Sequence, residues 1–159
     1  NKELEFVAEI VSSFTQTVND KYWNFDIKGF AEPLQFLTYK KGGKYDSHMD
    51  INWENLNSKR PNRKITTIIQ LTDDDKYYGG DLKIDVDNKN DFFIPRKKGD
   101  IVCFPSFLFF TCGVNVSTCG NDNIFKFFHG KLSNCWIFRS TSPKNWITEC
   151  SSRLTISGS

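Results

Sequence analysis

Histidine is scarce in this sequence, and several other shortages narrow what the chain can be. The 159 residues include two histidines, one methionine and five prolines. No apolar run approaches the roughly 20 residues of a membrane-spanning helix, and no signal-peptide pattern opens the chain. The formal net charge of +2 gives no electrostatic case for a nucleic-acid partner. The sequence therefore predicts a soluble, cytoplasmic protein with no membrane partner.

Cysteine is absent from the first hundred residues, and acidic residues become rare after them. Of the 19 acidic residues only Asp122 and Glu149 follow Asp100. The five cysteines form no CxxC pair and are odd in number, which fits neither a zinc module nor a complete disulfide framework. We interpret them as free thiols in a reducing compartment. They are Cys103, Cys112, Cys119, Cys135 and Cys150.

The pattern of apolar residues predicts one helix followed by strands. Leu4, Val7, Ala8, Val11 and Phe14 have the spacing of one helical face. From Pro33 onward, short β-branched or alternating runs are separated by turn residues. The expected strands span residues 34–39, 64–71, 81–86, 92–94, 101–104, 124–132 and 135–140. A helix before about eight short strands favours a mainly β sandwich or barrel with a helical flank.

His48 and Asp50 are the first candidates for a chemical site. On an extended strand, residues i and i+2 project from the same face, so both side chains can reach one metal ion. Two histidines and one carboxylate form the facial triad of non-haem Fe(II) oxygenases. The pair alone is weak evidence, because the chain has many aspartates. A surface histidine beside a loop carboxylate is the alternative.

The sequence around this pair carries a more specific signal. Residues 39–50, YKKGGKYDSHMD, resemble the YxxGxxYxxHxD segment of 2-oxoglutarate- and Fe(II)-dependent oxygenases of the prolyl-4-hydroxylase-like (PKHD-type) branch. Further similar segments follow in order: RKITTIIQL from Arg63, GGDL at 79–82, PRKKGD at 95–100 and FPSF at 104–107. Together they cover about residues 33–109, and their order makes the resemblance specific.

The resemblance implies a double-stranded β-helix, or jelly roll, in a single domain of residues 1–159 with an atypical part at 110–159. It implies Fe(II), 2-oxoglutarate, O2 and ascorbate as cofactors, and hydroxylation of a prolyl or similar residue in a peptide or protein. Succinate and CO2 would be the co-products. It also implies that Tyr39 hydrogen-bonds the cosubstrate, although a half-buried strand aromatic is an equal alternative. The same fold acting on a nucleobase or small molecule, and an inactive jelly roll used for binding, remain alternatives.

The resemblance ends after Phe109. In the family a histidine ligand follows FPSFL almost at once, and an Arg or Lys about ten residues later holds 2-oxoglutarate. The aligned residue here is Phe110, which cannot bind iron, and no basic residue stands at the expected place. If residues 111–123 are an insertion, His129 completes the triad and Arg139 holds the carboxylate of the cosubstrate.

This assignment of His129 and Arg139 to the site depends on the local strand pairing. A three-residue loop at 132–134 would place His129 opposite Ile137 and on the face of Arg139, whereas a two-residue loop would turn Arg139 away. Alternatively, His129 is an ordinary histidine and the third ligand is lost. A further alternative is that residues 110–159 are altered sequence, such as a changed reading frame.

The polar segment after the HxD pair is a candidate for substrate binding. Residues 51–62 contain Trp53 and Arg60, and loops at this place in relatives close over the substrate. We therefore expect Trp53 and Arg60 to contact a peptide. A solvated loop without such contacts is the alternative.

Overall fold

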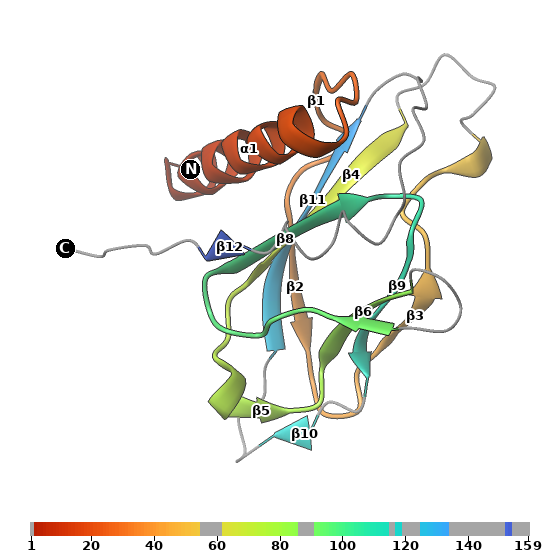
Figure 1. The fold of residues 1–159 in the computed structure, drawn as a ribbon. Helices are drawn as coiled ribbons and strands as arrows, with labels where there is room; N and C mark the ends of the chain where they lie inside the picture. Colours follow the sequence, from red (N-terminus) through yellow and green to blue (C-terminus); the bar gives the residue numbers. More distant parts are fainter. Residues whose placement is uncertain are drawn as a thin grey trace.

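In the part of the chain that the structure describes, two main antiparallel sheets, a two-stranded pair and one α-helix make up the fold, as the computed structural model shows (Figure 1). The structure describes residues 2–54, 62–85, 91–114, 117–118, 125–133 and 152–153, with only the backbone for residue 91 and from residue 112 onward. The elements are α1 (Lys2–Tyr22), β1 (Gly29–Phe30), β2 (Gln35–Tyr39), β3 (Tyr45–His48), β4 (Arg63–Gln70), η2 (Asp74–Lys76), β5 (Tyr77–Tyr78), β6 (Asp81–Asp85), β7 (Asp91–Phe93), β8 (Asp100–Pro105), β9 (Phe109–Val114), β10 (Ser117–Thr118), β11 (Phe125–Ser133) and β12 (Ser152–Arg153).

Successive strands cross between the two sheets. The larger sheet has the order β1-β11-β4-β8-β12, with β2 also paired to β11, and the smaller one has the order β3-β9-β6-β7. Strands β5 and β10 form a separate two-stranded pair. Because β2, β4, β8 and β11 lie in one sheet and β3, β6 and β9 in the other, the chain winds as a double-stranded β-helix. The expected jelly roll with an N-terminal helix is confirmed.

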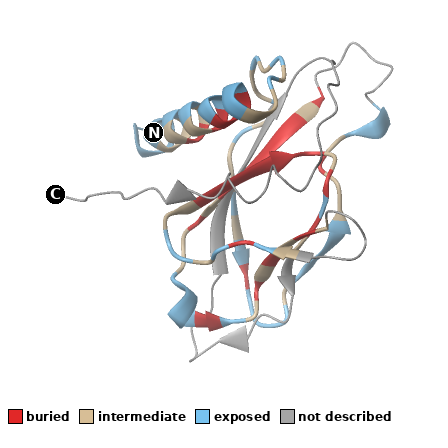
Figure 2. Ribbon diagram, in the orientation of Figure 1, coloured by how far each residue is buried: buried red, intermediate tan, exposed pale blue. Residues whose placement is uncertain are grey.

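Strand β4 lies at the centre of the structure and is buried on both faces (Figure 2). Ile65 packs with Val18 of α1 and Cys103 of β8 on the outer face of the sheet. Ile68 packs on the other face, in the core cluster that contains Ile84 of the smaller sheet. This double burial explains why the strand reads as an almost continuous β-branched run rather than an alternating one.

The helix is fixed to the sheet by polar contacts as well as by apolar packing. The buried hydroxyls of Thr15 and Thr67 lie 2.7 Å apart, which ties α1 to β4. At the end of α1, Asn19 donates its side-chain amide to the carbonyl of Phe25 and accepts from the amide N–H of that residue. Asn24, with φ of 51°, adopts the left-handed conformation that ends many helices. The helix is longer than the expected apolar stripe, and of the five residues in that stripe Val11 is buried whereas Leu4 is 50% exposed.

A glycine turn delivers the chain from β2 to β3. Gly42 has φ of 75°, which favours glycine, and Gly43 donates its N–H to the carbonyl of Lys40. A Cβ on Gly43 would lie 2.9 Å from that carbonyl oxygen, so a larger residue would shift the turn. The turn residues expected from the sequence therefore have a direct role in placing β3.

Most expected strands are present, with one important difference after Phe109. Residues 109–114 form β9, which pairs with β3 and β6. Residues 111–114 are therefore a strand of the smaller sheet and not part of an insertion. The expected strand at 124–132 corresponds to β11, and the one at 135–140 lies outside the described residues. Within the described residues, no helix is long and apolar enough to cross a bilayer.

A buried tyrosine closes the core at the end of the barrel near β5. Tyr77 is 1% exposed, and its hydroxyl accepts a hydrogen bond of 2.9 Å from the side-chain amide of Gln70. The guanidinium of Arg96 lies 5.3 Å from the centre of the Tyr77 ring and pairs with Asp81. Burial raises the pKa of Tyr77 to about 12, and the positive charge of Arg96 opposes this shift. The folded protein thus favours the neutral phenol.

This pKa shift predicts a loss of stability in alkali. Because the pKa is raised above its unfolded value of 10.0, the stabilisation is complete below pH 10 and is lost as the pH rises toward 12. We expect the free energy of unfolding to fall by about 1–2 kcal/mol more in the native protein than in Tyr77→Phe over this window. Urea unfolding at pH 8, 10 and 11 measures the difference. Tyr78→Phe, at the exposed neighbouring residue, should behave as the native protein does.

Candidate metal centre

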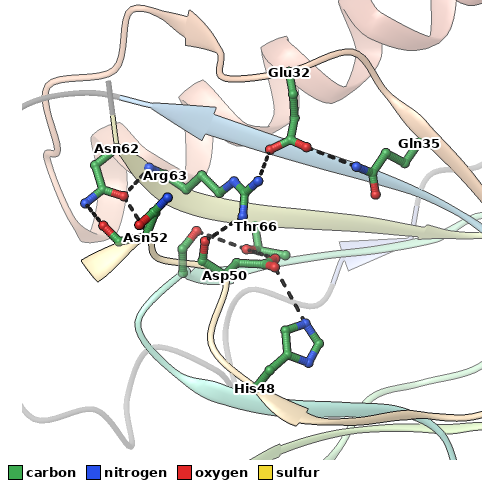
Figure 3. A network of polar contacts seen from close by, with 9 residues as sticks. Glu32, Gln35, His48, Asp50, Asn52, Asn62, Arg63 and Thr66 are labelled. Carbon is green, nitrogen blue, oxygen red and sulfur yellow. Dashed lines mark hydrogen bonds and ion pairs between the residues drawn. The ribbon is translucent and has the colours of Figure 1, made fainter. Parts of the chain in front are cut away.

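The side chains of His48 and Asp50 approach one another at the end of β3. Nε2 of His48 lies 3.6 Å from Oδ1 of Asp50 (Figure 3). Donor atoms in adjacent corners of a metal's coordination sphere, each about 2.1 Å from the ion, are about 3 Å apart. The two atoms therefore need only a small movement to bind one ion. The carboxylate is 2% exposed and the imidazole only partly exposed, so the pair is sheltered but open on one side.

His48 is already held with the correct nitrogen toward Asp50. Its Nδ1 lies 2.8 Å from the carbonyl oxygen of Asp46. A carbonyl oxygen can only accept, so Nδ1 must carry the proton. In the neutral imidazole the lone pair is therefore on Nε2, the nitrogen that faces Asp50. A backbone carbonyl in this role is a common way of orienting a metal-binding histidine.

A β-bulge in β3 turns His48 toward the barrel. In the pairing of β3 with β9, Tyr45 faces Cys112 and His48 faces Phe110, so β3 has one more residue than β9 in this interval. Without the extra residue, position 47 would face Phe110 and His48 would lie on the other face. The sequence analysis expected His48 and Asp50 on one straight strand. Instead, β3 ends at His48, and Asp50 follows in a bend.

Buried hydroxyl groups fix the carboxylate of Asp50. Thr66 of β4 donates its hydroxyl to Oδ2 of Asp50 at 2.8 Å. The hydroxyl of Ser106 lies 2.9 Å from that of Thr66, and both residues are fully buried. Ile51 also donates its N–H to the carbonyl of Ser106. Because Oδ2 is occupied by Thr66, Oδ1 is the oxygen left to face His48.

The backbone around Asp50 is held by a second set of polar contacts. Arg63 donates from Nη1 to the carbonyl of Asp50 at 3.1 Å and pairs through Nη2 with Glu32 (Figure 3). Asn62 donates to the carbonyl of Asn52 and accepts from the N–H of Asn52, which closes the base of the loop after the HxD pair. None of these residues was predicted as part of the site, since only the three-dimensional strand pairing brings them together.

The position next to His48 on the neighbouring strand is occupied by phenylalanine. Phe110 faces His48 across the ladder, its ring centre lies 4.3 Å from that of His48, and it is 3% exposed. Phe110 offers no metal-binding atom. Among the residues whose side chains the structure describes, no third His, Cys, Asp or Glu joins His48 and Asp50. The described residues fit two protein ligands for a metal ion but not a third.

The backbone at residue 129 belongs to the other sheet. In β11, position 129 pairs with Ile68 of β4 on one side and Gln35 of β2 on the other. Both ladder positions of residue 129 are therefore occupied, and Ile137, its expected partner, lies outside the described residues. Positions 66, 68 and 131 share its face of the sheet by register. The side chain of His129 is not described, so its role as a ligand stays a prediction.

The remaining expected site residues divide into described and undescribed ones. Tyr39 is buried in the core cluster that also holds Phe110. Trp53 is 53% exposed, three residues after Asp50. Arg60 and Arg139 lie outside the described residues. The predicted roles of these four residues stay untested.

Comparison with known protein families shows the family to which the chain belongs. The sequence model of the 2OG-Fe(II) oxygenase superfamily matches residues 34–136, which is more than half of the chain. The chain belongs to the 2OG-Fe(II) oxygenase superfamily. The family match continues through β9 and the whole of β11, beyond the point at which the recognisable motifs stop.

Individual relatives of this superfamily member agree with the assignment. A PKHD-type hydroxylase of Synechococcus sp. (strain CC9311) is 34% identical over 113 residues, covering 67% of this chain and 49% of the relative. A Pseudomonas putida prolyl-4-hydroxylase has a similar fold, with a TM-score of 0.59 and 14% identity over 80% of this chain and 65% of that one. A Burkholderia pseudomallei oxidoreductase of the 2OG-Fe(II) oxygenase family gives a TM-score of 0.53 and 12% identity, over 75% and 50%. The chain spans about half the length of its curated relative.

The contact between Thr66 and Asp50 predicts a measurable effect on metal binding. Thr66→Val leaves Oδ2 of Asp50 without its buried donor, so the carboxylate can rotate. We expect Mn(II) to bind about tenfold more weakly and the free energy of unfolding to fall by about 1–3 kcal/mol. Titration with Mn(II) and urea unfolding measure the two effects, and Thr66→Ser should restore metal binding.

Thr67 provides the matched control for this prediction. It lies next to Thr66 but bonds Thr15 of α1 on the opposite face of β4. Thr67→Val should therefore destabilise the fold without weakening Mn(II) binding. Equal losses of metal affinity in the two valine variants would show that Thr66 acts only through general stability.

Proposed function

We propose that the protein is a 2-oxoglutarate- and Fe(II)-dependent dioxygenase that hydroxylates a prolyl or similar residue in a peptide or protein. The observation that carries the proposal is the pair of the partly exposed His48 and the buried Asp50, with Nε2 and Oδ1 directed toward one another in a jelly roll of this superfamily. A carboxylate held this close to an imidazole nitrogen fits two corners of a metal site.

Under this proposal, the chain's own residues hold and orient the reactants. His48 and Asp50 bind Fe(II), and the metal with 2-oxoglutarate and O2 supplies the oxidising chemistry when bound. Thr66 fixes the orientation of the Asp50 carboxylate through Oδ2. Tyr39 and Arg139 are the proposed contacts of the cosubstrate, and the hypothesis from the sequence that His129 is the third ligand is tested below. Ascorbate is expected to keep the iron reduced.

The nature of the substrate is proposed from the surroundings of the pair. Tyr45 packs its ring 4.3 Å from that of His48 and is 53% exposed, and Trp53 is exposed to the same degree. Exposed aromatic rings beside a catalytic site are suitable for binding the ring of a proline or the backbone of a peptide. Two similar proteins are named a prolyl-4-hydroxylase and a PKHD-type hydroxylase, which favours a peptidyl substrate.

A second function is favoured by one specific observation. Phe110 occupies the place beside His48 where a further ligand would complete the metal site. An inactive jelly roll that binds a peptide beside His48 and Asp50 would tolerate this residue. The two functions differ in a direct measurement, because only the enzyme converts 2-oxoglutarate to succinate.

Succinate formation tests the proposed activity. The protein is incubated with Fe(II), ascorbate, 2-oxoglutarate, O2 and a proline-rich peptide, and we expect succinate to accumulate. His48→Ala and Asp50→Asn should reduce the rate at least 100-fold, because each removes a proposed iron ligand. Asp20→Asn, a similar change on the exposed part of α1, should leave the rate unchanged.

The outcomes separate the alternatives. If the native protein forms no succinate, and Mn(II) with a 2-oxoglutarate mimic does not raise its melting temperature, the inactive binding protein is the better description. His129→Ala tests the third ligand from the sequence: an unchanged rate in this variant would remove His129 from the site.

A further inference from the structure

We infer that Phe110 fills the third-ligand position of the metal centre, so that the site has two protein ligands and a single substitution, Phe110→His, completes it. The inference rests on the proposed metal-binding role of His48 and Asp50. It assigns the missing corner of the site to position 110 of β9, and not to position 129 of β11.

The strand pairing places position 110 where a third ligand could share the ion. Residues directly opposite in an antiparallel ladder have Cβ atoms about 5 Å apart and project from the same face. Phe110 is opposite His48, and the bulge in β3 gives both residues the same inward face. A donor atom on residue 110 would therefore lie beside the imidazole of His48, on the inward face of the smaller sheet.

The packing of Phe110 shows that its side chain lies inside the barrel. Its ring centre lies 4.3 Å from that of His48 and 5.0 Å from that of Phe104, the latter in an edge-on arrangement. With 3% exposure, the ring occupies space between the imidazole and the core. The ring centre of Tyr45 also lies 4.3 Å from that of the imidazole. The ring of His48 thus contacts two aromatic rings.

This aromatic contact orients His48 but gives nothing to a metal ion. A phenyl ring has no lone pair, and it keeps water from one side of the imidazole. An imidazole at position 110 is slightly smaller than the phenyl ring, so it fits the same space without overpacking. It would add a neutral nitrogen to one imidazole and one carboxylate, which is the donor set that suits Fe(II) and Mn(II).

Position 129 has a different relation to the pair. Its backbone lies in the larger sheet, opposite Ile68, whereas His48 lies in the smaller sheet. Position 131, which is opposite Thr66, is closer along the ladder to the residue that holds Asp50. No strand pairing joins position 129 to His48 in the described ladders, while position 110 is its direct partner.

Metal affinity tests the inference independently of activity. Mn(II) is titrated by calorimetry into the native protein, Phe110→His and Phe109→His, each checked for native circular dichroism. Phe109 is adjacent, 45% exposed and on the opposite face of β9, so its variant adds the same imidazole away from the site. We expect Phe110→His to bind at least tenfold more tightly than the native protein, and Phe109→His to match the native protein within twofold.

Two further variants define the ligands. His48→Ala in the Phe110→His background should lose the gain, because the new imidazole then has only Asp50 as a partner. His129→Ala should bind Mn(II) as the native protein does. The inference is overturned if Phe110→His folds but binds no more tightly than Phe109→His, or if His129→Ala alone weakens binding tenfold.

A second substitution covers the case in which the histidine variant does not fold. Cysteine is small, is tolerated in apolar cores and binds metal as the thiolate. With Co(II), Phe110→Cys should show the thiolate-to-cobalt charge-transfer band near the ultraviolet, and Phe109→Cys should not. Absence of the band in a folded Phe110→Cys protein that binds Co(II) would also overturn the inference.

The test separates this inference from the proposed function. If Phe110→His gains metal affinity but neither it nor the native protein forms succinate with 2-oxoglutarate and proline-rich peptides, the geometry of position 110 is right and the dioxygenase proposal is wrong. If the native protein forms succinate and Phe110→His shows no gain in affinity, the dioxygenase proposal stands and the third corner lies elsewhere.

Discussion

The buried carboxylate of Asp50 is the constraint on which the site depends. An aspartate at 2% exposure is costly unless its oxygens are bonded, because transfer of a charge from water into the interior is strongly unfavourable. The hydroxyl of Thr66 satisfies Oδ2, and His48 faces Oδ1. The same arrangement that makes burial tolerable therefore also leaves one oxygen directed toward the imidazole. Burial of the carboxylate and the proposed binding of a metal ion therefore require the same orientation of Asp50.

Strand β4 connects this constraint to the rest of the fold. Its inner face supplies Thr66 to the site, and its outer face packs Ile65 and Thr67 against α1. Arg63, at the start of the strand, bonds the backbone of Asp50 and pairs with Glu32. A shift of β4 by one residue would exchange the two faces, removing Thr66 from the carboxylate and placing Ile65 or Thr67 in its position. The register of the central strand thus determines the geometry of the metal centre.

The sequence predicted those parts of the site that depend on local pattern. The HxD pair and its flanking motifs lie within twelve residues, so their chemistry could be recognised without the fold. The roles of Thr66 and Ser106 could not be predicted, because these residues are 40 positions apart in the sequence. They meet only because β4 pairs with β8, which ends just before Ser106. The bulge in β3 was also missed, because it depends on the pairing with β9 rather than on residue type. The helix was predicted from the spacing of apolar residues, and the jelly roll was predicted from the family resemblance that the ordered motifs carry.

The change in composition after residue 100 affects the fold and the site differently. A strand needs only side chains that pack on a pleated sheet, and many sequences meet that need. Accordingly, residues 109–114 and 125–133 form β9 and β11 and complete both sheets, although the family motifs have ended. A metal ligand needs one atom at one position, and a phenyl ring at residue 110 cannot supply it. The jelly roll can therefore survive a change in sequence that leaves no donor atom at residue 110, so membership of the superfamily and completeness of the candidate metal centre are separate properties of this chain.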